Sequence, residues 1–207
     1  MNRASFSVYH VLSARLAQQL VVKDLLHDLL ICWADTDPLV DTYALGGPRL
    51  RYADGKAKEL EVAVPLVTTL RSGLVEHWDT AWSTTSANVP LPNRIKRAHA
   101  EASGAQYRLF DRRVFESNRT ETKNRKSAQR VLYAGHDLVT EEAECRALLE
   151  LVNEPKTISH LSAKLGKPET YALLVALRLW LQGRVTLPMT SSLMSAAWIV
   201  AGTGHGN

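Results

Sequence analysis

The chain has 207 residues, which is enough for one mid-sized domain or two small ones with a real hydrophobic core. Its 45% apolar and 22% charged residues are ordinary for a water-soluble globular protein. The net charge of +4 is modest, but residues 94–130 hold eleven Lys/Arg against four Asp/Glu, so the remainder is net acidic. The positive charge therefore forms a local patch.

The composition also excludes several classes of protein. The start of the chain lacks a basic segment followed by an apolar run, so we expect no signal peptide. The longest mostly apolar stretch near the end, 193–201, is too short to cross a membrane. Cys32 and Cys145 belong to no paired metal-ligand motif, and both lie in predicted amphipathic helices. We therefore expect reduced, mostly buried cysteines in a cytoplasmic protein with no membrane contact.

The first half of the chain predicts a helix followed by a sheet. Residues 14–34 carry leucines and a tryptophan at helical spacing, and Pro38 ends that segment. Short β-like runs follow, separated by glycine-containing turns, at 40–44, 49–52, 60–69 and 74–78. The composition then predicts a loop over 79–92, a helix over 93–103 and a strand over 107–116.

The second half predicts a helix over 119–130, a linker over 133–137 and a separable unit beyond it. Within that unit we expect helices over 141–153, from Thr157 to Leu165 and over 169–182, with a strand at 183–187. The order helix, helix, turn, helix, strand is typical of a winged-helix domain. We therefore divide the chain into a first domain over 1–135 and a winged-helix domain with its tail over 136–207.

The helix over 119–130 carries a row of positive charges. Arg119, Lys123, Lys126 and Arg130 are spaced four, three and four residues apart, so they fall within roughly 60° of one face. The row is about 16 Å long at the helical rise. Because like charges repel, such a row indicates an anionic partner, and a nucleic-acid backbone is the best candidate.

Further cations flank this row along the chain. The predicted DNA-binding residues are Arg94, Lys96, Arg97, Arg112, Arg113, Arg119, Lys123, Arg125, Lys126 and Arg130. Lys164, Lys167, Arg178 and Arg184 offer further contacts in the second unit, although the helix over 169–182 is so apolar that protein contact is favoured there over base readout. The alternative for the whole patch is a solvated surface that binds nothing.

Two glutamates form the candidate catalytic and metal site. Glu61 and Glu76 fall on successive predicted strands, and neighbouring strands would allow both carboxylates to hold a divalent metal such as Mg²⁺. The alternative is two structural glutamates at strand ends. His27 is a second candidate ligand or base, or else a surface histidine of an amphipathic helix.

The order of elements resembles TnsA-type endonucleases, the restriction-like subunits of heteromeric cut-and-paste transposases. The resemblance covers nearly the whole chain and is carried by a leading helix, a hairpin from Leu60 to Trp78, a winged-helix end and the segments 37–40, 104–109, 118–119 and 124–125. It implies a restriction-endonuclease-like α/β fold, a mixed sheet flanked by helices, followed by a small winged-helix domain. It also implies double-stranded DNA as substrate, Mg²⁺ for cleavage, and a transposase or another element-encoded protein as partner.

The family pattern has an acid on the first helix, an acid on the first hairpin strand and Glu/Gln-x-Lys on the second. His27 falls about where the helix acid belongs, and Glu61 is the nearest acid on the first strand. Glu76 fits the Glu/Gln position, but Trp78 replaces the lysine that would stabilise charge at the reacting phosphate. The sequence thus predicts a TnsA-like DNA-binding subunit with impaired catalysis and a structural or bridging role.

Two other functions remain open. The first is an active Mg²⁺-dependent endonuclease that uses Glu61 and Glu76 with a cation recruited from elsewhere, for example Lys96 or His77. The second is a winged-helix DNA-binding regulator whose first domain only dimerises. A homodimer is likewise an open alternative for the assembly.

Overall fold

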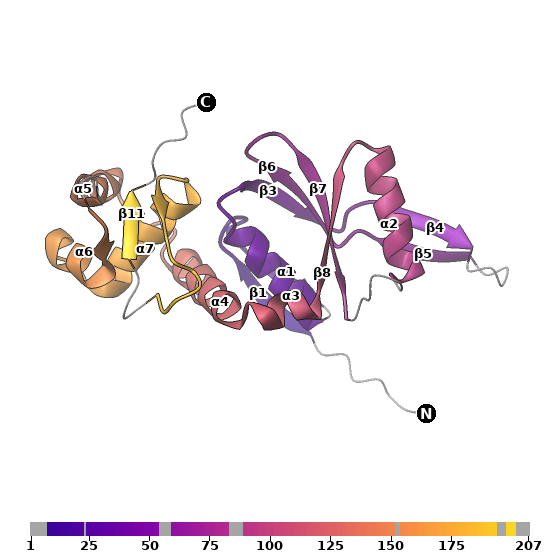
Figure 1. Cartoon of the computed structure of the whole chain (residues 1–207), viewed down its shortest axis with the longest axis horizontal. Coiled ribbons are helices and arrows are strands. Elements are labelled where there is room, and N and C mark those ends of the chain that lie inside the picture. The colour runs from indigo at the N-terminus through magenta and orange to yellow at the C-terminus, as the bar shows by residue number, and fades with distance from the viewer. Residues whose placement is uncertain are drawn as a thin grey trace. The chain divides into compact units, whose positions relative to one another are not determined.

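The structure is a computed structural model, and it describes residues 8–22, 24–53, 59–82, 89–151, 154–193 and 198–201, the last four as backbone alone. The chain divides into two compact units (Figure 1). Unit 1 comprises Met1–Val11, Val21–Ala34 and Leu39–Ser117, and unit 2 comprises Leu12–Leu20, Asp35–Pro38 and Asn118–Asn207. None of the helices in the described ranges is long and apolar enough to span a membrane.

A four-stranded mixed sheet forms the centre of unit 1. Its strands are β3 (Val40–Leu45), β6 (Leu66–Leu70), β7 (Val75–Ala81) and β8 (Gln106–Asp111), hydrogen-bonded in that order. The first three strands are antiparallel, whereas β7 and β8 are parallel. A parallel pair needs a crossover, and α2 (Leu91–Ala102) provides it. The expected α/β class with a mixed sheet and flanking helices is therefore confirmed.

The two faces of this sheet are covered by different helices (Figure 1). Trp78 of β7 packs on Phe110 of β8, and Phe110 packs on Trp33 of α1 (Leu25–Asp35). His77 points to the opposite face, because side chains alternate along a strand, and stacks on His99 of α2. α2 begins after Pro90 and has a second proline at its start, where a missing N–H costs nothing.

The described parts of unit 1 include two further elements. β4 (Arg49–Ala53) and β5 (Glu59–Ala63) form a separate two-stranded antiparallel sheet. The short helix α3 (Arg112–Ser117) follows β8 directly and buries Phe115 against Trp33. A further two-stranded sheet joins β1 (Tyr9–Ser13) and β2 (Gln18–Val22), and its residues are divided between the two units, with Leu12–Leu20 in unit 2.

Unit 2 is mainly helical. Its helices are α4 (Arg119–Ala134), α5 (Glu141–Leu151), α6 (Ile158–Leu165) and α7 (Glu169–Leu181). A small antiparallel sheet in the order β10-β11-β9 joins β9 (Lys156–Thr157), β10 (Val185–Thr186) and β11 (Trp198–Ala201). Thr157 caps α6 as expected, since its hydroxyl accepts from the backbone N–H of His160 at 3.2 Å. α7 is the centre of the core, with eight buried residues between Ala172 and Trp180.

Several expected boundaries differ from the observed ones. The predicted helix over 14–34 is wrong in its first part, because 18–22 is strand β2 and the helix spans Leu25–Asp35. The predicted strand over 107–116 ends at Asp111 and continues as α3. Contacts group α4 with unit 2, so the division falls after Ser117, whereas the sequence analysis placed it after residue 135.

The cysteines and the predicted 79–92 loop also differ in part from expectation. Cys32 is buried as predicted, but Cys145 is exposed, and both are free thiols. The predicted 79–92 loop is shorter than expected, because β7 runs to Ala81 and α2 begins at Leu91. Residues 83–88 of this loop and the tail from residue 202 lie outside the described residues.

Candidate nucleic-acid interface

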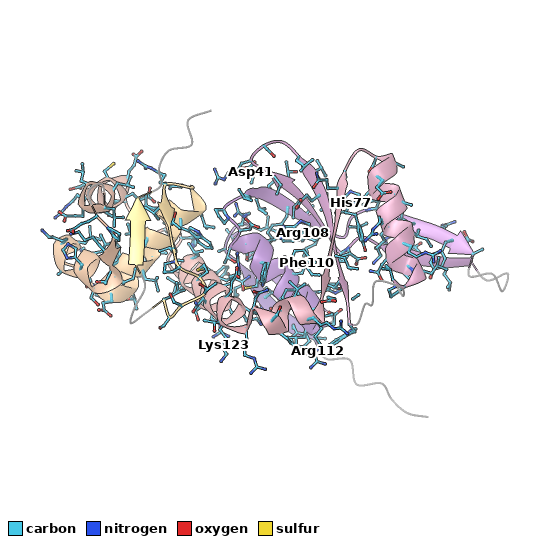
Figure 2. All side chains as sticks on the ribbon, viewed as in Figure 1. Asp41, His77, Arg108, Phe110, Arg112 and Lys123 are labelled. Carbon is cyan, nitrogen blue, oxygen red and sulfur yellow. The ribbon has the colours of Figure 1, made fainter. Side chains whose placement is uncertain are left out.

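The cation row on α4 is presented to solvent. Arg119, Lys123 and Arg130 are exposed and Lys126 is half-buried. Figure 2 shows the Lys123 side chain projecting away from the α4 ribbon. The other side of the helix packs on α7, so α4 is anchored by one face while the cations lie on the other.

The inward face of α4 is fixed by close contacts. Ala128 and Leu132 are buried, and Asn124 donates to the carbonyl oxygens of Met189 and Ser191. Gly135 ends the helix where a Cβ atom would lie 2.2 Å from Leu174 of α7. These contacts fix this face of α4 inside unit 2 and hold the cation row in place.

Arg125 is not part of the exposed row, contrary to its predicted DNA-binding role. It is 8% exposed, because it falls on the inward side of α4. Its Nη1 donates to the carbonyl oxygen of Thr36 at 2.7 Å, its Nη2 pairs with Glu121 at 2.8 Å, and its guanidinium lies 5.7 Å from the Trp180 ring centre. Arg125 is therefore a buried structural cation of unit 2.

Unit 1 carries its own exposed cations. Arg94 and Arg97 are exposed on α2, and Arg97 lies over the Tyr107 ring at 5.4 Å. Arg112 and Arg113 are exposed on α3, where Figure 2 shows the Arg112 side chain pointing away from the helix. Arg112 pairs with Glu116 at 2.6 Å. Because this ion pair is exposed it contributes little stability, so Arg112 can exchange Glu116 for another anion.

Lys96, in contrast, belongs to a buried polar cluster on the α2 face of the sheet. Its Nζ lies 2.9 Å from Oδ1 of Asp79, which is 1% exposed. The other carboxylate oxygen accepts from Nδ2 of Asn93 at 2.6 Å and from the hydroxyl of Tyr107 at 2.7 Å. Lys96 is thus neither a DNA contact nor a spare catalytic cation, since it neutralises a buried carboxylate.

The same cluster keeps Tyr107 protonated. Burial raises the pKa of the Tyr107 hydroxyl far above its ordinary value, and the negative charge of Asp79 raises it further. Tyr107 consequently acts as a neutral hydrogen-bond donor that ties β8 to β7 and α2. Asp79, Asn93 and Tyr107 were not predicted as site residues. Asp79 directly follows the predicted strand 74–78, and a charged residue at a strand end was the one available signal.

Glu76 lies on the opposite face, which is packed against α1. It is 8% exposed, and its Oε2 accepts from Nε1 of Trp78 at 2.6 Å. The Nη1 atom of Arg108 lies 3.9 Å from the same oxygen, and the guanidinium stacks 5.0 Å from the Trp78 ring and 4.8 Å from the Phe110 ring. Arg108 and Phe110 both come from β8 (Figure 2). The cation near Glu76 is therefore Arg108, and neither Lys96 nor His77, which lie on the α2 face.

The structure does not bring Glu61 and Glu76 together as neighbours. Glu61 lies on β5, which pairs with β4, while β7 pairs with β6 and β8. Glu61 is exposed and lies 3.4 Å from Arg49. A shared metal requires that the two glutamates lie on neighbouring strands, and this condition is not met. The predicted 60–69 strand is interrupted at Val64 and Pro65, so that β5 and β6 belong to different sheets.

Mg²⁺ does not fit these residues. One carboxylate is paired with arginine at the surface, and the other is engaged by indole and guanidinium groups that repel or exclude a cation. Within the ranges that the structure describes, no three His, Cys, Asp or Glu side chains form a group that could hold a metal ion.

The histidines lie in separate settings. Nδ1 of His27 pairs with Asp24 at 2.7 Å at the start of α1. His77 is 5% exposed, and its Nδ1 has no hydrogen-bond partner among the described residues. Burial lowers the pKa of His77 below its ordinary value, and the nearby His99 lowers it further. A buried neutral imidazole of this kind is part of the packing.

The second unit presents few cations for base readout. Arg178 of α7 is engaged by Glu144 at 2.6 Å and by the carbonyl oxygen of His136 at 3.0 Å. Lys164 lies 3.6 Å from Glu150, and Lys167 lies over the Tyr171 ring. The apolar surface of α7 is buried within unit 2, so this helix has little polar surface for a major groove, while its predicted contact with a partner protein stays a prediction.

No protein-family model matches this sequence, and a search of curated proteins also found no match.

Proposed function

We propose that this chain binds double-stranded DNA through the cation row of α4 and acts without cutting it. The observation that carries the proposal is the division of α4 into a packed inner face and an outer face with exposed Arg119, Lys123 and Arg130. Cations held on a rigid helix have their positions fixed before binding, which favours contact with a regular row of phosphates.

Phosphate contact is favoured over base reading. The row of two arginines and two lysines extends over about 16 Å, a length that meets several phosphates but offers no groove-shaped reading surface. Unit 1 adds Arg94 and Arg97 on α2, together with Arg112 and Arg113 on α3. Binding of this kind has weak sequence preference and strong salt dependence.

The absence of cleavage follows from the carboxylates. Glu76 is engaged by Trp78 and Arg108, and Glu61 lies on a different sheet beside Arg49. Hydrolysis of a phosphodiester by this class of site needs a metal held by carboxylates and a cation beside the reacting phosphate. The arrangement supports a role in holding or positioning DNA.

The resemblance to TnsA-type proteins extends this proposal to a transposition or mobile-element machinery. Its support is the order of α1 and the elements of the central sheet: α1, the antiparallel strands β3, β6 and β7, then α2 and the parallel strand β8, followed by helices with a small three-stranded sheet. The β1–β2 and β4–β5 pairs and α3 are additional to this order. In that setting a transposase or another element-encoded protein would dock on unit 2, where Leu138 is 64% and Leu149 is 73% exposed.

The test is duplex-DNA affinity of charge-row variants. Lys123→Ala with Arg130→Ala is expected to weaken binding of a random-sequence duplex roughly tenfold at low salt. The matched control is Arg49→Ala with Arg51→Ala, which removes the same charge from an exposed sheet. Equal weakening in both variants would mean that net charge alone drives binding, and it would overturn the proposal.

One outcome would favour a different function. Tight binding of one short sequence that depends on Lys167 and Arg184, and not on α4, would indicate a winged-helix regulator.

A further inference from the structure

A cavity of about 410 Å³ lies within unit 1, beside α1 and the ends of β2, β3, β5 and β6. All but His27 and Gly46 of the residues that line it carry hydrocarbon side chains. Its volume falls within the range of about 300–1,000 Å³ typical of small-molecule sites. None of the residues used in the DNA-binding proposal lines it, so the two sites are separate.

The cavity has a buried floor and an apolar mouth. Leu30, Ile31 and Leu66 are each at most 1% exposed and form the floor. Val21, at 62% exposed, and Leu45, at 37%, lie at the mouth. Apolar side chains left in water around a hollow gain free energy when an apolar ligand covers them.

His27 supplies the polar group. Its Nδ1 lies 2.7 Å from Oδ2 of Asp24, while the other carboxylate oxygen accepts from the His27 backbone N–H at 2.9 Å. A carboxylate only accepts, so Nδ1 carries a proton, and whenever the ring holds that proton alone Nε2 is an acceptor. The lining therefore combines a large apolar surface with one hydrogen-bond acceptor.

The lining of the cavity favours an uncharged ligand. An anion at the imidazole would be repelled by the Asp24 carboxylate that pairs with the same ring, and the residues that line the cavity include no lysine or arginine to offset that repulsion. A metal ion would find a single imidazole among hydrocarbon groups. A neutral molecule with one hydroxyl donor satisfies both parts of the lining.

We propose that this cavity binds an uncharged apolar alcohol whose hydrocarbon part fills the apolar space and whose hydroxyl donates to Nε2 of His27. This inference is independent of the proposed function.

The test is titration of the full chain with 2-naphthol, followed by ligand fluorescence and calorimetry. We expect saturable binding of one molecule per chain. We expect 2-fluoronaphthalene, which lacks the hydroxyl donor, to bind roughly three- to tenfold more weakly. We expect the anion 2-naphthoate to bind more weakly than 2-naphthol. Lack of saturable 2-naphthol binding, or tighter binding of the naphthoate, would overturn the proposal.

Two variants locate the site. His27→Leu is expected to bind both neutral ligands equally, because the acceptor is lost while the apolar surface remains. Ala63→Trp places an indole at an exposed lining position on β5 and is expected to abolish binding. Its control is Ala53→Trp, the same change at an exposed position at the other end of the β4–β5 sheet. A retained hydroxyl preference in His27→Leu, or equal affinities in the two tryptophan variants, would contradict the assignment.

Discussion

Nε1 of Trp78 donates a 2.6 Å hydrogen bond to Oε2 of Glu76, two residues earlier on the same face of β7. The indole occupies the position where a lysine is expected from the resemblance, and it engages the carboxylate that would otherwise bind metal. Arg108 stacks on that indole and lies 3.9 Å from the same oxygen. The face is therefore a packed aromatic and ion-paired cluster.

This cluster predicts that the protein has no metal-dependent nuclease activity. A divalent ion would have to displace the indole N–H and the guanidinium from Glu76, and both groups are held by packing. We expect supercoiled plasmid to remain intact with Mg²⁺ or Mn²⁺, for the natural chain and for Glu76→Ala alike. Nicking that requires the metal and disappears in Glu76→Ala would refute this prediction.

The Asp79 cluster predicts a large loss of stability when Lys96 is neutralised. Lys96→Met keeps the aliphatic stem but leaves a carboxylate that is 1% exposed without its cation. We expect the free energy of unfolding, measured by denaturant titration, to fall by about 3–5 kcal/mol. Arg94→Met on the same helix is the control, since an exposed change costs about 0.5 kcal/mol or less. Equal losses in the two variants would show that the ion pair is unimportant.

His77 predicts a dependence of stability on pH. Its folded-state pKa is lowered from 6.5 by burial and then by His99, so the unfolded chain takes up the proton first as the pH falls. Stability should therefore decrease from pH 6.5 down to the lowered pKa, by at most about 1.4 kcal/mol per pH unit for this one group.

The measurement is the free energy of unfolding between about pH 5 and pH 7, a window in which ordinary carboxylates stay ionised. His77→Phe should reduce the slope in this window. His136→Gln, which removes an exposed histidine from unit 2, is the comparison variant. An unchanged slope in His77→Phe would disprove this assignment.

Arg125 and Lys123 of α4 are two residues apart, and we expect the first to matter for stability and the second for DNA binding. Arg125→Ala removes a guanidinium bound to Glu121 and Thr36, so we expect unfolding free energy to fall by about 3–5 kcal/mol. Lys123→Ala, at an exposed position, should leave stability within about 0.5 kcal/mol and weaken DNA binding. Reversed effects, with Arg125→Ala remaining stable but losing DNA affinity, would contradict the assignment of these two side chains.

The sequence predicted the amphipathic helices well because their apolar spacing is long and regular. α7 lies close to its expected limits, and Thr157 caps α6. α4 begins at the expected residue but continues to Ala134, into the predicted linker. The secondary structure of short segments was harder to predict. Leu20 and Val22 fit both a helical spacing and the two-residue alternation of a strand, and the second pattern holds in β2.

The candidate site was less predictable because it depends on which strands pair. The run 60–69 read as one strand that could place Glu61 beside Glu76, but Val64 and Pro65 divide it between two sheets. The side-chain orientation of Lys96 depends on its contact with Asp79, and that of Arg125 on its contact with Thr36. Both partners are far away in the sequence. Only the outward cations of α4 could be assigned from helical spacing alone.

The salt dependence of DNA binding tests the central proposal most directly. Each phosphate contact contributes about 0.9 to the slope of log affinity against log salt concentration. Lys123→Ala with Arg130→Ala should therefore lower the magnitude of the slope by about 1.8 on a duplex of fixed length. Arg49→Ala with Arg51→Ala should leave the slope unchanged. An unchanged slope in the α4 variant, with duplex affinity equal to that of the natural chain, would contradict the account.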